Sequence, residues 1–234
     1  MGAARSRSSM LKDWRKAVYL ATVGLPRAPT GWLTVMAMPS EHRPFYAVVA
    51  EMLDLQPEDD LLDVACGSAT LLHEHGWRAR TVAGLDASDI QLAAARRRLT
   101  RRIDRGTAEI VKGDAGALPW QDGRFSAVTC IAGMDFFPDP QKAVSEMYRV
   151  LRPGGRAVVT MGTAAEDVST AGQIDALGCR VFCETYARRL MQDAGFGDVT
   201  VSYPPWGGTS RVCNAIARVW GYPEARVVRG VRES

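Results

Sequence analysis

One short apolar run, which passes directly into a turn of small residues, constrains the fold of this chain more than any other feature. Leu61, Leu62 and Val64 surround Asp63 in a buried-strand pattern, and the turn at 65–69 (Ala-Cys-Gly-Ser-Ala) follows without a bulky side chain. A strand that ends in such a turn before a helix lets a bound molecule approach the backbone closely. One glycine among small residues closes many strand-to-helix turns, so the rest of the chain must decide its meaning.

The chain beyond this turn alternates between short apolar runs and helical segments. Strands are predicted near 60–64, 81–85, 108–111, 126–131, 156–161, 198–203 and 211–219, and helices near 69–76, 89–102, 140–150 and 184–194. Strands that alternate with helices of this length form parallel βαβ units. No helix separates the last two runs, which predicts an antiparallel pair. The fold class is therefore α/β, with a doubly wound, mostly parallel seven-stranded sheet and an antiparallel last strand.

An N-terminal helical lead-in precedes the sheet. Amphipathic patterns predict helices at 10–23 and 42–55, each closed by proline-containing breakers. The expected organisation is a disordered tail (1–9), a helical lead-in or lid (10–56), the α/β domain (57–221) and a C-terminal tail (222–234).

Composition limits the classes of function. The 234 residues are 47% hydrophobic, enough for one sizeable core, and the net charge is only +3. The densest basic cluster, at 96–102, lacks interleaved aromatic residues, so a solvated helix face is favoured over a nucleic-acid surface. No apolar run reaches the roughly 18 residues of a membrane-spanning helix, and no signal core follows Arg5 and Arg7. We expect a cytoplasmic protein with neither a nucleic-acid nor a membrane partner.

The five cysteines are an odd number and form no CxxC pair. This usage is typical of a reduced chain. Cys179 and Cys183 are four residues apart, but no series of histidines or carboxylates supplies the remaining ligands of a metal site. We expect no bound metal.

Three aspartates fall at or near the ends of predicted strands, namely Asp63, Asp86 and Asp114. The ligand crevice of an open parallel sheet lies at the carboxyl ends of its strands. A carboxylate at Asp86 can accept both hydroxyls of a ribose. The alternative is that Asp86 caps the next helix, although Ser88 is the better cap. The G-x-G-x-x-G turn of dinucleotide-binding enzymes is absent, which favours a nucleoside without phosphates.

The order of these motifs resembles the class I S-adenosylmethionine-dependent methyltransferases. The matching segments are Gly84-Leu85-Asp86, 111–115, 118–128, Phe136-Phe137-Pro138-Asp139-Pro140 and 148–155. The resemblance covers roughly residues 42–203 and is greatest to the subgroup of ubiquinone and menaquinone biosynthesis methyltransferases and their small-molecule relatives. It implies a Rossmann-like methyltransferase fold and S-adenosyl-L-methionine as the cofactor.

The resemblance also implies roles for individual residues. The first turn would face the amino-acid portion of the cofactor, with Asp63 near its ammonium group, Asp86 on the ribose, and Asp114 and Ala115 on the adenine edge. The expected cofactor-binding residues are Asp63, Ala65, Cys66, Gly67, Asp86, Ala87, Gln91, Gly113, Asp114, Ala115 and Ile131.

The chain departs from the family pattern at several positions. Ala65 and Ala69 replace common glycines, and because alanine disfavours positive φ, the turn is expected to avoid the left-handed region there. Gln91 stands where relatives often carry an apolar residue against the nucleoside, with a surface position as the alternative. Asp135 replaces a histidine of many relatives. It is the candidate catalytic residue, for orienting or deprotonating the acceptor, with a cofactor contact or a structural loop cap as the alternatives.

A sulfonium methyl group is already activated, so the protein mainly has to align the acceptor and exclude water. A hydroxyl acceptor would benefit from a base, whereas an amine or enolate needs no strong base. The candidate substrate-binding residues are Tyr19, Trp32, Met36 and Phe136. For residues of the lead-in, simple coverage of one sheet edge is the alternative.

The expected function is methyl transfer to a small apolar or aromatic metabolite. The first alternative is a protein of the same fold that acts as a cyclase, isomerase or non-catalytic binder. A macromolecular methyltransferase is disfavoured, because the fourth strand ends Ala-Gly-Met-Asp and not in an Asn-Pro-Pro-Tyr type loop. The sequence leaves the oligomeric state open, and a homodimer is compatible with it.

Overall fold

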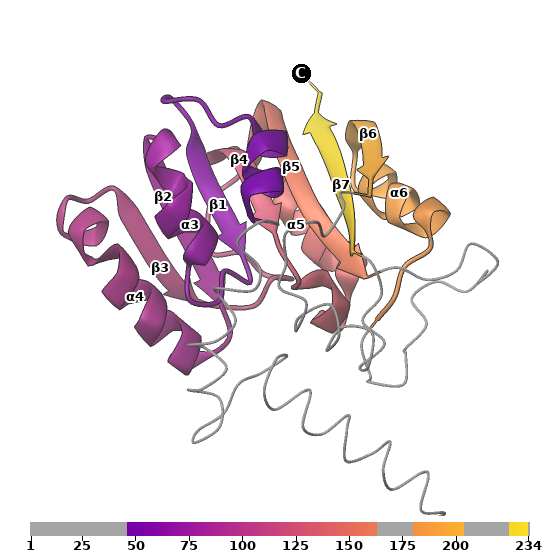
Figure 1. The fold of residues 1–234 in the computed structure, drawn as a ribbon. Helices are drawn as coiled ribbons and strands as arrows, with labels where there is room; N and C mark the ends of the chain where they lie inside the picture. The colour runs from indigo at the N-terminus through magenta and orange to yellow at the C-terminus, as the bar shows by residue number, and fades with distance from the viewer. Residues whose placement is uncertain (1–45, 163–179, 204–224, 234) are drawn as a thin grey trace, which may run out of the picture.

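A computed structural model of the chain describes residues 46–162, 180–203 and 225–233 (Figure 1). These residues form a seven-stranded sheet in the order β3-β2-β1-β4-β5-β7-β6. The strands are β1 (Asp60–Val64), β2 (Thr81–Asp86), β3 (Ala108–Lys112), β4 (Phe125–Cys130), β5 (Leu151–Gly162), β6 (Phe196–Ser202) and β7 (Ala225–Arg232). Strands β1 to β5 pair in parallel, and β7 is antiparallel to both β5 and β6. The predicted α/β class and the antiparallel last strand are confirmed.

Helices cover both faces of this sheet (Figure 1). They are a helix at 46–53, α3 (Thr70–Glu74), α4 (Asp89–Asp104), α5 (Pro140–Val150) and α6 (Glu184–Asp193), with short 3-10 turns η2 (Gly76–Arg78) and η3 (Met134–Phe136). Local capping explains where two of them begin. The hydroxyl of Ser88 accepts from the amide of Gln91 at the start of α4, and Asp139 accepts from the amide of Lys142 at the start of α5.

The core lies in two layers, because successive residues of each central strand point to opposite faces. Leu61 packs with the helix at 46–53 and with α3 and α4, whereas Leu62 and Val64 pack with α5 and α6. All residues of β1 and β4 are buried. Strands that are covered on both faces are mostly apolar in sequence, and this is why the sequence predicts their positions well.

The last strand lies later in the chain than predicted. β7 pairs with β5 from Arg156–Val231 to Gly162–Ala225, so the expected C-terminal tail at 222–234 is part of the α/β domain. The arginines that alternate with valines made this segment look like a polar tail. One of them, Arg226, is almost completely buried and donates to the carbonyl oxygen of Phe182. The strand predicted at 211–219, the tail at 1–9 and the helix at 10–23 lie outside the described residues.

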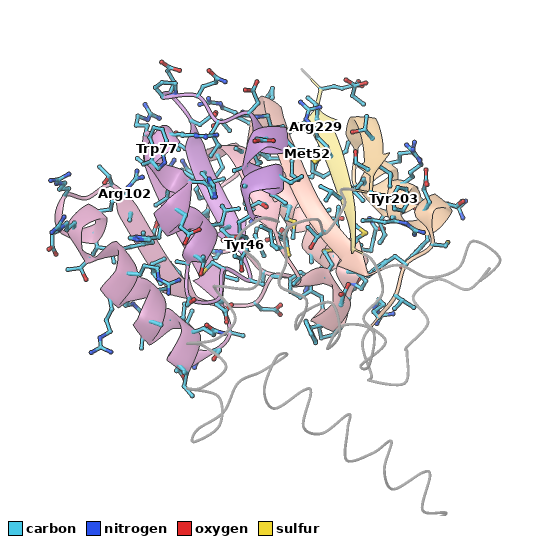
Figure 2. The ribbon with its side chains drawn as sticks, in the orientation of Figure 1. Tyr46, Met52, Trp77, Arg102, Tyr203 and Arg229 are labelled. Atoms are coloured by element: carbon cyan, nitrogen blue, oxygen red, sulfur yellow. The ribbon has the colours of Figure 1, made fainter. Side chains whose placement is uncertain are left out.

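Arg156 of β5 fixes the helix at 46–53 to the sheet. Its guanidinium donates to the carbonyl oxygens of Leu53 and Asp54, which end the helix, and its Nη2 lies 2.5 Å from Oδ2 of Asp59. The last carbonyl groups of a helix have no partner within the helix, so an arginine there satisfies them. The helix is held at its C-terminal end, and its other end carries Tyr46 toward the carboxyl end of β1 (Figure 2).

Candidate functional site

The turn after β1 is hydrogen-bonded to the end of β2. The amide of Cys66 donates to the carbonyl oxygen of Leu85 over 3.0 Å, and the amide of Gly67 donates to Oδ2 of Asp86 over 2.8 Å. Sγ of Cys66 lies where a Cβ at Gly84 would come within 2.8 Å of it, so the thiol packs on the backbone of β2. Burial, the largest cause, raises the pKa of this thiol. The turn is thereby held at the carboxyl ends of β1 and β2.

The expectation that this turn avoids the left-handed region is wrong. Ala65 has φ of 58°, Gly67 of 52° and Ala69 of 57°. The chain must reverse from a strand into a helix within a few residues, and the hydrogen bonds to β2 determine its path. A left-handed conformation costs alanine on the order of 1–2 kcal/mol relative to glycine. The two alanines therefore hold the required backbone at a cost in stability.

Asp63 is a buried acceptor on β1 beside this turn. The residue is 3% exposed, and its Oδ1 has no hydrogen-bond partner among the described residues. Burial and, to a smaller extent, the negative charge of Asp86 raise the pKa of Asp63 well above its usual value. A carboxylate in this position is stabilised by a ligand that brings a positive charge or a hydrogen-bond donor.

Asp86, the last residue of β2, accepts two backbone amides. Its Oδ1 accepts from Ser88 and its Oδ2 from Gly67, both over 2.8 Å. Burial raises the pKa of Asp86 although these hydrogen bonds oppose the shift. The helix cap is Ser88 and not Asp86, as expected. Since a carboxylate offers about four lone-pair positions, Asp86 keeps acceptor capacity for a ligand.

Gln91 is buried and is not a surface residue of its helix. It is 7% exposed, and its Oε1 has no hydrogen-bond partner among the described residues. Oε1 lies 3.6 Å from the position that a Cβ would take on Gly67. The side chain of Gln91 therefore extends from α4 to the turn after β1.

The end of β3 lies next to the end of β2. The amide of Gly113 donates to the carbonyl oxygen of Asp86 over 3.1 Å, and a Cβ on Gly113 would come within 2.7 Å of Leu85. Asp114 is exposed and its Oδ1 accepts from the amide of Gly116 over 2.9 Å, whereas Ala115 is buried. A side chain at 113 would therefore displace the side chain of Leu85.

The segment after β4 packs directly on the first turn. A Cβ on Gly133 would lie 2.7 Å from both the Cβ of Ala65 and the Sγ of Cys130. Ile131 is 9% exposed at the end of β4. The close approach at Gly133 therefore brings the 131–136 loop to the site.

Asp135 and Phe136 are half-buried in this loop. Oδ1 of Asp135 accepts from the amide of Gly162 over 2.8 Å, and its backbone oxygen accepts from Arg180 over 2.9 Å. The carboxylate thus joins the loop after β4 to the end of β5. This hydrogen bond favours the structural alternative for Asp135 and leaves its catalytic role a prediction.

Two side chains at the site were not among the expected site residues. Tyr46 lies on the helix at 46–53 (Figure 2), where burial and the negative charge of Asp63 raise its pKa above the usual value. Arg98 of α4 donates to the carbonyl oxygen of Ser68 and to the hydroxyl of Thr70, and so stabilises the turn. Helical spacing could have found Arg98, since it lies seven residues, about two turns, after Gln91.

The basic cluster on α4 is more than a solvated face. Besides Arg98, Arg102 donates to the carbonyl oxygens of Gly76 and Ala79. The bonds of Arg102 satisfy backbone groups at and beside η2, and Arg102 follows Arg98 by about one helical turn. Exposed arginines remain at 96, 97 and 101.

The structure places the expected cofactor-binding residues at the ends of β1, β2, β3 and β4, apart from Gln91 on α4, and Ala87 is exposed after Asp86. Tyr19, Trp32 and Met36 lie outside the described residues. Within the described ranges no three side chains of His, Cys, Asp or Glu gather in a metal-binding arrangement. A search of the same ranges finds no helix with the length and apolar character needed to span a membrane.

The chain is similar in sequence to known methyltransferases. Residues 62–159 match the family model of a methyltransferase domain. The chain is 36% identical over 136 residues to the 2-phytyl-1,4-beta-naphthoquinone methyltransferase of Arabidopsis thaliana, with 56% of this chain and 52% of that protein covered. It is 43% identical over 102 residues to the demethylmenaquinone methyltransferase of Thermus thermophilus, with 42% and 45% covered. The chain spans about half the length of the curated relatives it matches.

Solved structures share the fold. A phosphoethanolamine N-methyltransferase 2 of Haemonchus contortus superposes with a TM-score of 0.72 at 14% identity, over 94% of this chain and 60% of that one. A putative methyltransferase of Bacillus halodurans superposes with a TM-score of 0.62 at 20% identity, over 81% and 99%. At these identities the likeness is one of fold.

Proposed function

Because this chain belongs to the class I S-adenosylmethionine-dependent methyltransferases through residues 62–159, we propose that it transfers a methyl group from S-adenosyl-L-methionine to a small apolar or aromatic acceptor. One observation carries the proposal. Two buried oxygens without a hydrogen-bond partner, Oδ1 of Asp63 and Oε1 of Gln91, lie at the turn within the matched family domain. Buried acceptors of this kind favour a ligand rich in donors.

The chemistry of these residues fits the cofactor. The carboxylate of Asp63 would hold the ammonium group of the methionine portion, which would offset the cost of its burial. Asp86 would accept from the ribose, and the buried Ala115 with Asp114 would face the adenine edge. The absence of a diphosphate cradle suits a nucleoside without phosphates.

When bound, the cofactor supplies a methyl group that is already activated by its sulfonium. The chain has to hold the acceptor in line with that methyl group and keep water out. Asp135, in the loop after β4, would orient the acceptor or take a proton from its hydroxyl group. Its hydrogen bond from Gly162 holds the carboxylate at the junction of β4 and β5.

We propose a reduced quinone as the acceptor class, because the curated relatives include enzymes named for naphthoquinone, menaquinone and ubiquinone methylation. Reduction to the hydroquinone makes a ring carbon nucleophilic. That carbon forms the bond to the methyl group, the sulfur keeps the electron pair of the broken S–C bond, and the ring carbon loses its proton. Loss of the phenolic proton to a carboxylate such as Asp135 would increase the electron density of the ring.

The test uses the full chain with S-adenosyl-L-methionine labelled in its methyl group. We expect label in a chemically reduced, short-chain demethylnaphthoquinone and an equal amount of S-adenosylhomocysteine, with none when the reductant is omitted. Cofactor binding without transfer to any hydroquinone would contradict the acceptor class. Failure to bind the cofactor in calorimetry would contradict the whole function.

The same proposal includes a cytoplasmic location and no nucleic-acid partner, supported by the small net charge and the cysteine usage. Fractionation of cells that produce the full chain tests the location. A homodimer is the proposed assembly, and light scattering of the purified protein tests it.

A further inference from the structure

Gln91 and Asp86 meet at the same residue of the first turn. Oδ2 of Asp86 accepts from the amide of Gly67, and Oε1 of Gln91 lies 3.6 Å from the position of a Cβ on Gly67. With φ of 52°, Gly67 adopts a backbone that other residues strain to reach, and it has no side chain to separate the two acceptors. A carboxylate and a carboxamide therefore both approach this one residue of the turn, and the unit formed by β2 and α4 contributes both.

The two acceptors differ in what they already bind. Each oxygen of Asp86 accepts one backbone amide, whereas Oε1 of Gln91 is buried without a partner among the described residues. Leaving an amide oxygen buried and unpaired costs stability. An apolar side chain of similar length would avoid that cost at this position. The buried glutamine thus indicates a donor that arrives with the ligand.

The charge of each buried hydrogen-bond acceptor indicates which donor group of the ligand it binds. Asp63 is the charged group beside β1, with its own unpartnered oxygen, and suits the cationic ammonium group. A neutral carboxamide oxygen suits a neutral hydroxyl. On the basis of the proposed function, we propose that Gln91 is a specificity-determining residue that accepts a hydrogen bond from a ribose hydroxyl beside Asp86. The ribose is then recognised by two side chains of one βα unit.

The experiment measures the affinity of the purified full chain for S-adenosylhomocysteine and for its 2′-deoxy and 3′-deoxy analogues by calorimetry. The proteins are the unchanged chain, Gln91→Met, Gln91→Leu and the control Gln192→Met, an exposed glutamine of α6. Met and Leu keep an apolar volume at 91, and thermal unfolding of each variant checks its folding.

In the unchanged chain and the control, removal of the hydroxyl that Gln91 binds weakens affinity by about fivefold, the scale of one neutral hydrogen bond. In the Gln91 variants, S-adenosylhomocysteine is expected to bind about fivefold more weakly, and removal of that same hydroxyl has little further effect. If each deoxy analogue loses as much affinity in Gln91→Met and Gln91→Leu as it does in the unchanged protein, the inference is overturned while the proposed function stands. No binding of S-adenosylhomocysteine to the unchanged chain would instead overturn the proposed function, and this inference with it.

Discussion

The amide of Gly67 donates a hydrogen bond of 2.8 Å to Oδ2 of Asp86. This bond connects the turn after β1 with the last residue of β2, two positions 19 residues apart in the chain. It keeps Gly67 in its left-handed conformation and orients the carboxylate at the same time. The carboxylate that would bind the ribose is therefore also a support of the turn.

Asp86→Ala should weaken the affinity for S-adenosylhomocysteine by about 1.5–3 kcal/mol, the scale of lost charge-assisted hydrogen bonds. Calorimetry measures this change. The control is Asp89→Ala, because Asp89 is exposed at the start of α4 and pairs with Lys112. If Asp86→Ala binds as tightly as the unchanged chain, the ribose assignment is wrong.

Asp63→Asn should stabilise the ligand-free protein and weaken cofactor binding. The folded protein raises the pKa of Asp63 above the unfolded value, so it binds more protons than the unfolded chain and loses stability as pH rises between the two values. Asparagine has a similar shape and does not ionise, so at pH 7.5 the free energy of unfolding should increase by about 1–3 kcal/mol. Urea unfolding measures it.

The control for this prediction lies on the same strand. Asp60 is paired with Arg80, and its pKa is lowered although burial opposes the shift, so Asp60→Asn should destabilise the protein. Loss of stability in Asp63→Asn at neutral pH would contradict the view that its ionised form is a cost.

Ala65→Gly should leave the stability unchanged or increase it by up to about 1 kcal/mol. Relief of the positive φ offsets the greater flexibility of glycine in the unfolded chain. Ala95→Gly, inside α4, should destabilise by about 1 kcal/mol. Chemical denaturation compares the two, and equal destabilisation would argue against strain at Ala65.

Arg156→Met should reduce the free energy of unfolding at neutral pH by about 3 kcal/mol, because it leaves the buried carboxylate of Asp59 without its cationic partner. Burial alone would raise the pKa of Asp59. Hydrogen bonds from Arg156, from the Gln56 amide and from Ser126 nevertheless hold this pKa at about 2. A lowered pKa contributes stability above the unfolded value of 3.8, which is lost as pH falls toward 2.

Unfolding followed between pH 5 and pH 2 should therefore show a smaller acid loss in Arg156→Met than in the unchanged chain. Arg152→Met is the control, since Arg152 is exposed in the same strand. If Arg156→Met loses as much stability between pH 5 and pH 2 as the unchanged chain does, groups other than Arg156 hold the pKa of Asp59 low.

Asp135→Asn distinguishes a base from a structural cap. Asparagine can still accept from the amide of Gly162, so folding and cofactor affinity should persist. If Asp135 removes a proton, the turnover of the hydroquinone should fall by about 100-fold or more. Asp139→Asn, at the start of α5, is the control. Equal turnover of Asp135→Asn and the unchanged chain would leave only the structural role.

Much of the fold was accessible from the sequence because its signals are local. The central strands are short, mostly apolar runs, since both faces of the sheet are covered, and Ser88 caps α4 as its position suggests. β7 was not predicted because arginines interrupt its valines. The burial of Arg226 depends on Phe182 and Tyr203, which are distant in sequence.

The sequence by itself determined the succession of strands and helices from β1 to β6, the resemblance to the methyltransferases, and the aspartates at the ends of the strands. Only the tertiary structure decided that Ala65 and Ala69 adopt positive φ, that Gln91 is buried, and that Arg98 supports the turn. The physical reason is the range of the interactions. Periodicity and capping act over a few residues, whereas the hydrogen bonds and burial that shape the turn come from strands and helices folded against it.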